Sequence, residues 1–318
     1  MTTLSTVTGP VASVRGRTLV HEHIRIGFAG AQLDPRVKLD EELLIQSAAD
    51  ELAALRAQHG VALIVDATPA DLCRDTRILR QVSERSGVGI VASTGMYREG
   101  AGYPPYWAMQ ETSDLEDFFT MELRDATEDP DVLCGVIKIA TSGAEPTPSE
   151  TRALQAAARV SRSRGTRVLT HTDPGGWVAG NPGLRQLETL VEGGVHPSSV
   201  VIGHACGAVE VDQLSALAER GAYIGFDRVG MTHVRSDEGR ADLIVALARL
   251  GYCDRILLAH DHQHHWVRMR PHPGAPSRVR SFSLLFEDFL PLLNARGMGP
   301  DDVERLLSSN PASFLFGA

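Results

Sequence analysis

The sequence lacks the segments that insert a protein into a membrane or export it. No stretch of 18 apolar residues occurs, so no transmembrane helix is predicted. The opening residues MTTLSTVTGP contain no basic region followed by an apolar run, so no secretory signal is predicted. The four cysteines, Cys73, Cys134, Cys206 and Cys253, are scattered without CxxC spacing. This usage favours reduced thiols and a cytoplasmic location.

Positive charge is also scarce. The chain has 31 basic residues against 40 acidic ones, giving a net charge of −9, and it has no long basic run. This balance argues against a nucleic-acid partner. No GxGxxG motif opens a helix, which weakens a dinucleotide-binding interpretation. No linker rich in Pro, Gly and Ser divides the chain, so we expect residues 1–318 to form a single domain.

What is present is one repeated pattern. A short β-branched apolar run is followed by a polar residue and an amphipathic helix, such as the one that begins after Asp40 and stops at Gly60. The predicted strands are 18–20, 62–65, 89–92, 135–139, 167–170, 200–203, 222–226 and 255–259. Strands that alternate with helices form parallel sheets. Eight such units in 318 residues predict a (β/α)8 TIM barrel.

Histidine is abundant, and it gathers at the ends of the predicted strands. His21 and His23 lie two residues apart, so both side chains face the same side of a strand. His171, His204 and Asp261 end three other strands, and in a barrel these ends meet at one face. Imidazoles with a carboxylate suit zinc and related metals. Packing them as an ordinary polar core is disfavoured, because several uncompensated polar groups in one layer are costly.

Lys138 interrupts an apolar strand in the segment GVIKIATSG. One interpretation is a buried ion pair with Asp261 or Asp66. The other is that burial lowers the pKa of the amine, so that the neutral form can react with CO2 and become an anionic metal ligand.

Seven motifs identify a family. They are TVTGPV…GRTLVHEHI, GVIKIATSG, VLTHTDPG, VVIGHACG, AYIGFDRVG, ILLAHD and NPASF, in this order from about Thr6 to Phe316. The chain resembles the phosphotriesterase family of the amidohydrolase superfamily, and it is most similar to the phosphotriesterase-like lactonases.

The resemblance implies a binuclear metal site at the C-terminal face of the barrel. His21, His23 and Asp261 would hold the more buried ion, and His171 and His204 the more exposed one. Zn2+ is expected first, with Co2+, Fe2+ and Mn2+ as alternatives.

Catalytic roles follow from the same resemblance. Lys138, as N6-carboxylysine, and a hydroxide would bridge the ions, and Asp261 would accept the proton of the attacking hydroxide. Tyr97 would contact the substrate or the hydroxide, with plain loop packing as the alternative. Arg228 fits the lactonase pattern, with an ion pair to Asp227 or another carboxylate as the alternative.

The resemblance implies a lactonase or carboxylic-ester hydrolase with promiscuous phosphotriesterase activity, acting on a small-molecule ester, lactone or organophosphate, and forming a homodimer. An amidase or open-chain esterase for an anionic acyl substrate is the first alternative. A non-catalytic ligand-binding barrel is the second, and the complete ligand set argues against it.

Two departures from the family pattern stand out. Gly207 occupies the position of the aspartate that relays protons in the family. The loop over 262–280 is rich in His and Arg where the lactonases have an apolar channel, which favours an anionic substrate unless the loop is simply a solvated tip. Further candidate substrate contacts, besides Tyr97 and Arg228, are Trp177, His262, Trp266 and Arg268.

Overall fold

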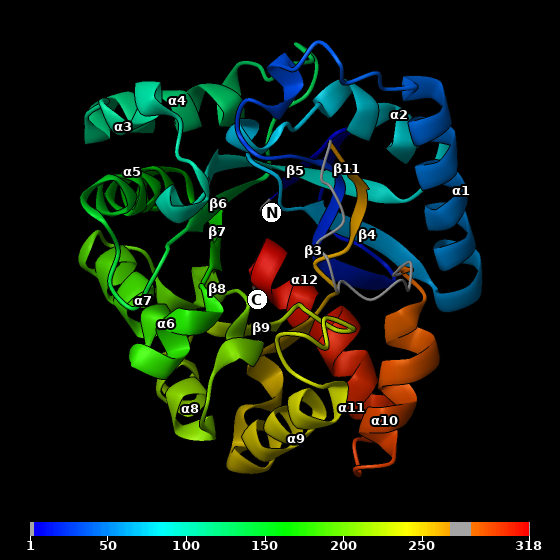
Figure 1. The fold of residues 1–318 in the computed structure, drawn as a ribbon. Coiled ribbons are helices and arrows are strands. Elements are labelled where there is room, and N and C mark those ends of the chain that lie inside the picture. Colours follow the sequence, from blue (N-terminus) through cyan, green and yellow to red (C-terminus); the bar gives the residue numbers. More distant parts are fainter. Residues whose placement is uncertain (1–2, 268–280, 318) are drawn as a thin grey trace.

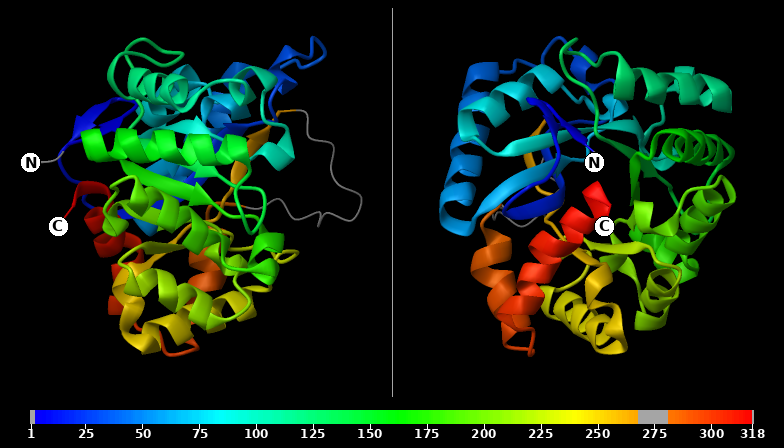
Figure 2. Two further views of the ribbon diagram at one scale, coloured as in Figure 1. Left: turned by 90° about the vertical axis from the view of Figure 1, so that its left-hand side faces the viewer. Right: turned by 180° about the vertical axis from the view of Figure 1, so that it is seen from behind.

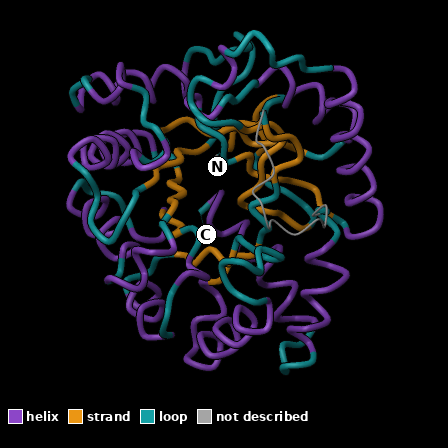
Figure 3. The backbone as a smooth tube through the Cα atoms, viewed as in Figure 1, coloured by secondary structure: helices purple, strands orange, loops and turns teal. Residues whose placement is uncertain are grey.

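A ring of parallel strands forms the centre of the molecule, with helices around it (Figures 1 and 3). The computed structural model describes residues 3–267 and 281–317. The eight strands of the ring are β3 (Arg17–Ile26), β4 (Val61–Asp66), β5 (Gly89–Met96), β6 (Val136–Ala140), β7 (Arg167–His171), β8 (Val200–Ile202), β9 (Tyr223–Phe226) and β10 (Ile256–Leu258). Each overlaps one of the predicted strands, and the predicted TIM-barrel fold is confirmed.

The α-helices within the described residues are α1 (Glu41–His59), α2 (Thr76–Ser86), α3 (Pro105–Ala108), α4 (Thr112–Arg124), α5 (Pro148–Arg164), α6 (Pro174–Ala179), α7 (Pro182–Glu192), α8 (Val211–Glu219), α9 (Asp237–Leu247), α10 (Leu290–Asn294), α11 (Pro300–Glu304) and α12 (Asn310–Phe316). Helices α1 to α9 lie in the connections between consecutive strands of the ring, and α10 to α12 follow the last strand. Helix α1 begins as predicted, because the Asp40 carboxylate accepts a hydrogen bond from the backbone N–H of Leu43. It ends at Gly60, which adopts a left-handed conformation with φ 69°.

The barrel closes through the segment that follows β10. There the backbone N–H of Asp261 donates to the carbonyl of His21 (3.1 Å), and the N–H of His23 donates to the carbonyl of His262 (2.8 Å). The chain then forms β11 (Gln263–Trp266), which pairs with β3 in parallel. The loop predicted over 262–280 therefore begins with a strand, and that part of the prediction is wrong.

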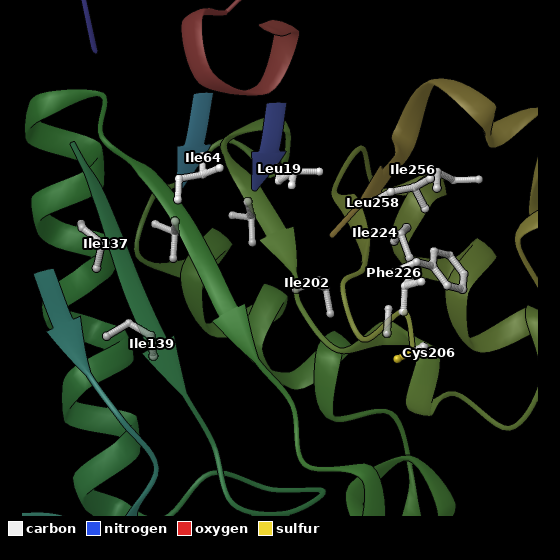
Figure 4. Close-up of a cluster of buried hydrophobic side chains, with 14 of the residues drawn as sticks. Leu19, Ile64, Ile137, Ile139, Ile202, Cys206, Ile224, Phe226, Ile256 and Leu258 are labelled. Atoms are coloured by element: carbon white, nitrogen blue, oxygen red, sulfur yellow. The ribbon is translucent and has the colours of Figure 1, made fainter. Parts of the chain in front are cut away.

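Two apolar layers hold the barrel together. The outer layer, between strands and helices, includes Leu19, Ile64, Ile137, Ile139, Ile202, Ile224, Phe226, Ile256 and Leu258 (Figure 4). The inner layer fills the barrel with alternate residues, including Val136 and Leu257, together with Phe314 of α12. Strand β6 therefore points Val136 inward and its neighbour Ile137 outward, and the same alternation turns Lys138 into the barrel.

The two chain ends lie at the same end of the barrel (Figure 2). The hairpin of β1 (Leu4–Thr6) and β2 (Gly9–Val11) contributes Leu4 to the inner layer there, beside the C-terminal helix. The opposite end, where the strands finish, is left for the polar side chains described below. Within 3–267 and 281–317, no helix is both long and apolar enough to cross a bilayer.

Candidate metal centre

A β-bulge in β3 turns the two histidines of the HEH sequence into the barrel. The register of β3 against β4 shifts between Leu19 and Glu22. Leu19 packs in the outer apolar layer and Val20 in the inner one, so a regular strand would point His21 outward. The extra residue of the bulge resets the alternation, and both His21 and His23 line the pocket at the strand ends.

One carboxylate orients two of the imidazoles. Asp227, directly after β9, lies with Oδ2 2.6 Å from Nδ1 of His21 and with Oδ1 2.8 Å from Nδ1 of His204. Burial alone would raise the pKa of Asp227, but the facing His204 and His21 rings hold it well below its usual range. An ionised carboxylate only accepts hydrogen bonds, so both rings donate through Nδ1. Each ring therefore presents the lone pair of Nε2 to the centre.

His23 is held by a second chain of hydrogen bonds. Its Nδ1 lies 2.7 Å from the hydroxyl of Thr68, whose backbone N–H donates to the buried carboxylate of Asp66. The same carboxylate accepts from the backbone N–H of Ile24 (2.8 Å). This chain fixes the ring so that Nε2 lies 3.1 Å from Oδ1 of Asp261.

Lys138 reaches the middle of the cluster from β6. Its Nζ lies 2.8 Å from Nε2 of His21 and 3.3 Å from the carbonyl of Thr170. Burial lowers the pKa of Lys138 to about 8, which makes the neutral amine accessible near physiological pH.

Two ligand candidates sit on unusual backbone. His204 (φ 58°) and Asp261 (φ 52°) both adopt positive φ, a region that non-glycine residues rarely occupy. The turn at Asp261 is held by Glu22, which is fully buried and accepts hydrogen bonds from the backbone N–H groups of His260 (2.9 Å) and His262 (2.8 Å). Strain of this kind persists where surrounding contacts fix it.

Three further side chains, those of Arg228, His171 and Tyr97, contact the cluster. The Nε of Arg228 lies 3.4 Å from Oδ2 of Asp261, so the ion pair joins these two residues. Within the described part of the chain, its Nη1 is buried and has no hydrogen-bond partner. His171 places Nδ1 2.7 Å from Nε2 of His204, and the Tyr97 ring packs edge-on against His171 at 4.9 Å.

These side chains line a pocket of about 430 Å³ at the strand ends. Its apolar wall consists of Ile26, Ala67, Pro174, Met231, Val234 and Trp266. Its polar lining consists of His21, His23, Tyr97, Lys138, His171, Arg228, His233, Asp261 and Gln263. The His204 ring packs edge-on against the His171 ring, with their centroids 4.2 Å apart. The structure therefore brings together all six predicted metal ligands, together with Tyr97, Arg228 and Trp266.

Trp177 does not line this pocket, contrary to expectation. It is 1% exposed, and its indole N–H donates to the hydroxyl of Thr172 (2.9 Å). A Cβ atom at Gly207 would lie only 2.6 Å from Cδ1 of Trp177. The indole therefore fills the space that an aspartate at position 207 would need.

His262, predicted as a substrate contact, does not face the pocket either. It is buried, but its ring packs against Phe282 and faces Glu51 of α1 instead of the pocket. Arg268, and with it most of the predicted basic loop, lies outside the described residues.

Sequence reasoning missed the residues that orient the ligands. Asp227 was considered only as an ion-pair partner of Arg228, and Glu22 was given no role. The sequence contained a cue for both, because Glu22 lies between two candidate ligands in a strand and Asp227 directly follows an apolar strand and precedes the candidate site residue Arg228. Thr68 gave no such signal, since a threonine after a strand is common, and Asp66 was considered only as an ion-pair partner of Lys138.

The donor set fits two transition-metal ions. His21 and His204 present Nε2, Nζ of Lys138 lies 2.8 Å from Nε2 of His21, and Asp261 supplies carboxylate oxygens 3.1 Å from Nε2 of His23 and 3.9 Å from Nε2 of His204. Outer partners that fix the tautomer of each ring are typical of metal-binding histidines.

Comparisons with known proteins agree with this arrangement. A sequence profile of the phosphotriesterase family matches residues 2–315. The aryldialkylphosphatase of Saccharolobus solfataricus is 28% identical over 94% of this chain and 95% of its own length. The N-acetyltaurine hydrolase of Rattus norvegicus is 27% identical over 98% of this chain and 97% of its own. A crystal structure of a mutant PTE-like lactonase from Deinococcus radiodurans superposes with a TM-score of 0.91 at 32% identity, covering 98% of this chain and 99% of that one.

Proposed function

The chain belongs to the phosphotriesterase family of hydrolases, and from this premise we propose that it hydrolyses lactones and other carboxylic esters, with promiscuous hydrolysis of phosphotriesters. The observation that carries the proposal is a buried set of candidate metal ligands at the floor of a pocket with an apolar wall. Ile26, Met231, Val234 and Trp266 offer contacts to a neutral acyl or alkyl group.

We propose that two divalent ions bind at the floor, zinc in the first instance. The proposed ligands are His21, His23, His171, His204, Asp261 and Lys138 as N6-carboxylysine. When bound, two ions in such a site acidify water and polarise the oxygen of the bond under attack.

The side chains around the proposed ions have separate roles in the reaction. Asp261 is ionised, because the neighbouring His204 and His23 hold its pKa well below the usual range despite its burial. It can therefore accept the proton released from water. Arg228, paired with Asp261, can donate from its buried Nη1 to a substrate oxygen. Tyr97 packs on His171 and limits the space beside it.

A second candidate function is hydrolysis of an amide or open-chain ester of an anionic acid. It is favoured by one observation, the unpartnered Nη1 of Arg228 within the pocket lining. A buried guanidinium donor is well suited to a carboxylate or sulfonate oxygen. The similarity to N-acetyltaurine hydrolases supports the same alternative.

A substrate panel separates these candidates. Zinc-loaded protein would be assayed with δ-lactones, neutral aryl esters, N-acyl amino acids, N-acyl aminosulfonates and a paraoxon-type triester. The proposal predicts the highest kcat/KM for the lactones or neutral esters and a weaker activity on the triester. The highest kcat/KM for an anionic amide would replace it with the second candidate. A protein that holds two ions per chain and hydrolyses none of these substrates would contradict both.

Arg228 variants sharpen the choice. Arg228→Met keeps the aliphatic stem but removes the donors, while Arg228→Lys keeps the charge. If an anionic substrate is recognised here, Arg228→Met should raise its KM at least about ten-fold, as expected for a lost charged hydrogen bond. The KM of a neutral lactone should change much less.

The proposal also includes a homodimer in the cytoplasm. In the described part of the chain the four cysteines are buried and free, in keeping with a reducing compartment. Light scattering on the purified protein measures the oligomeric state directly.

A further inference from the structure

A second cluster of metal-binding side chains lies outside the barrel mouth, between α1 and the start of β11. It comprises Glu51 of α1, His262 and His264, and we call it the Glu51 cluster. It lies apart from the pocket, because Gln263 lines the pocket while His262 and His264 face α1. Neither Glu51 nor His264 takes part in the function proposed above.

The ligand-type atoms of the cluster converge on one point. Oε2 of Glu51 lies 2.9 Å from Nδ1 of His264 and 3.9 Å from Nε2 of His262. All three atoms lie within 4.8 Å of one another. Ligand atoms about 2.0–2.2 Å from a shared zinc ion lie at separations of this order, so small rotations of the side chains would bring all three onto one ion.

Surrounding groups already fix the orientation of these side chains. The other carboxylate oxygen of Glu51, Oε1, accepts from the backbone N–H of Phe282 (3.1 Å) and from the hydroxyl of Ser281 (3.2 Å). This leaves Oε2 directed at the two rings. The second ring nitrogen of His264, Nε2, lies 2.9 Å from the hydroxyl of Ser47. Such outer partners are what metal-binding carboxylates and histidines normally have.

The cluster is accessible as well as ordered. The side chains of Glu51, His264 and His262 are 25%, 14% and 7% exposed, so an ion can enter from solvent and keep a water ligand. Two imidazoles and a carboxylate form a ligand set that suits zinc and related divalent metals.

We propose that Glu51, His262 and His264 bind a divalent transition-metal ion, with zinc as the best match, at a site separate from the barrel-mouth centre. The ion would join α1 to the segment that closes the barrel between β10 and β11. Because His262 directly follows Asp261, it would also stabilise the turn on which that ligand sits.

Counting zinc in variants tests the proposal. Metal-free wild-type protein, Glu51→Gln and His265→Ala would each be dialysed against buffered zinc, and bound zinc would be measured by elemental analysis. Glutamine retains an acceptor for Phe282 but removes the charged ligand. His265 is the control, since it lies in the same strand but outside the cluster.

We expect Glu51→Gln to bind one ion per chain fewer than wild type, and His265→Ala to bind the same number. Because the readout is a difference, it does not depend on how many ions the barrel mouth holds, and failure of the proposed function would not affect it. Equal zinc content in wild type and Glu51→Gln would overturn the proposal.

Ser47→Ala provides a variant that keeps all three ligands. Alanine is a good helix former, and only the hydroxyl that orients His264 is lost. Zinc affinity at this site should fall about ten-fold or more, as for other outer partners of metal ligands. If Glu51→Gln does not fold, this variant decides: lower affinity supports the site, and unchanged affinity contradicts it.

Discussion

Asp227 shows how a single residue can orient two candidate metal ligands. Its two oxygens accept from Nδ1 of His21 and Nδ1 of His204, so it selects the tautomer of both rings. The residue binds no substrate in our account. It acts by holding the Nε2 lone pairs in place before any ion arrives.

Asp227→Asn should therefore weaken metal binding more than it changes the fold. An amide accepts through one atom only, so one of the two rings loses its partner. We expect metal affinity to fall about 10–100-fold, with activity partly restored by excess metal. Titrating activity with zinc measures the shift. The surface variant Asp117→Asn is the control, and a titration curve for Asp227→Asn that matches this control would refute the role.

Buried neutral histidines should make the metal-free protein sensitive to acid. Burial lowers the pKa of His204 to about 3 and that of His171 well below its usual 6.5. Below about pH 6.5 these two histidines bind protons in the unfolded chain but stay neutral in the folded protein. The free energy of unfolding should therefore fall as the pH decreases below this value.

Urea unfolding of metal-free protein between pH 8 and pH 5 checks this. Each such histidine contributes a slope of up to about 1.4 kcal/mol per pH unit. His204→Asn should flatten the curve below pH 6.5, and a variant of an exposed residue, Asp117→Asn, is the control for effects of substitution in general. A slope that His204→Asn does not alter would show that another group controls acid sensitivity.

At the scale of elements, α6 packs against the turn after β8 so closely that an aspartate at position 207 has no room. Trp177 of α6 lies so close to Gly207 that a Cβ there would overlap its ring. Gly207→Asp should cost about 1–3 kcal/mol of stability, the usual range for overpacking a core.

A double-mutant cycle with Trp177→Leu isolates this effect. The smaller side chain opens space beside residue 207, so Gly207→Asp should be less destabilising in the Trp177→Leu background. Thermal or urea unfolding of the four proteins gives the interaction energy. If the two substitutions are simply additive, Trp177 is not what excludes the aspartate.

Sequence periodicity predicted the strands well, because each inward and outward layer needs alternating apolar residues. The periodicity also placed His21 and His23 on one side of their strand. It did not predict the bulge that turns both side chains into the barrel, since a bulge depends on pairing with β4. The strand β11 was missed because QHHW carries no apolar alternation, and its order comes from pairing with β3. Trp177 was misplaced because an aromatic residue near a strand end has the same pattern whether it faces a pocket or the core.

At the scale of the whole molecule, stability and chemistry occupy opposite ends of the barrel. The two termini lie at one end of the barrel (Figure 2), where Leu4 and Phe314 belong to the inner apolar layer. The candidate ligands line the pocket at the other end, where the strands finish. This separation lets the strand-end residues adopt strained or buried polar arrangements, such as the positive φ of His204 and Asp261, while the core maintains the fold.

The central claim is that the strand ends hold two metal ions. Its most direct test is anomalous X-ray diffraction from crystals of protein loaded with zinc in the presence of bicarbonate. Our account predicts two anomalous peaks at the barrel mouth about 3.5–4 Å apart, with density for a carboxylated Lys138 between them. A single peak, or two peaks that do not contact His21, Lys138 and His204, would contradict it.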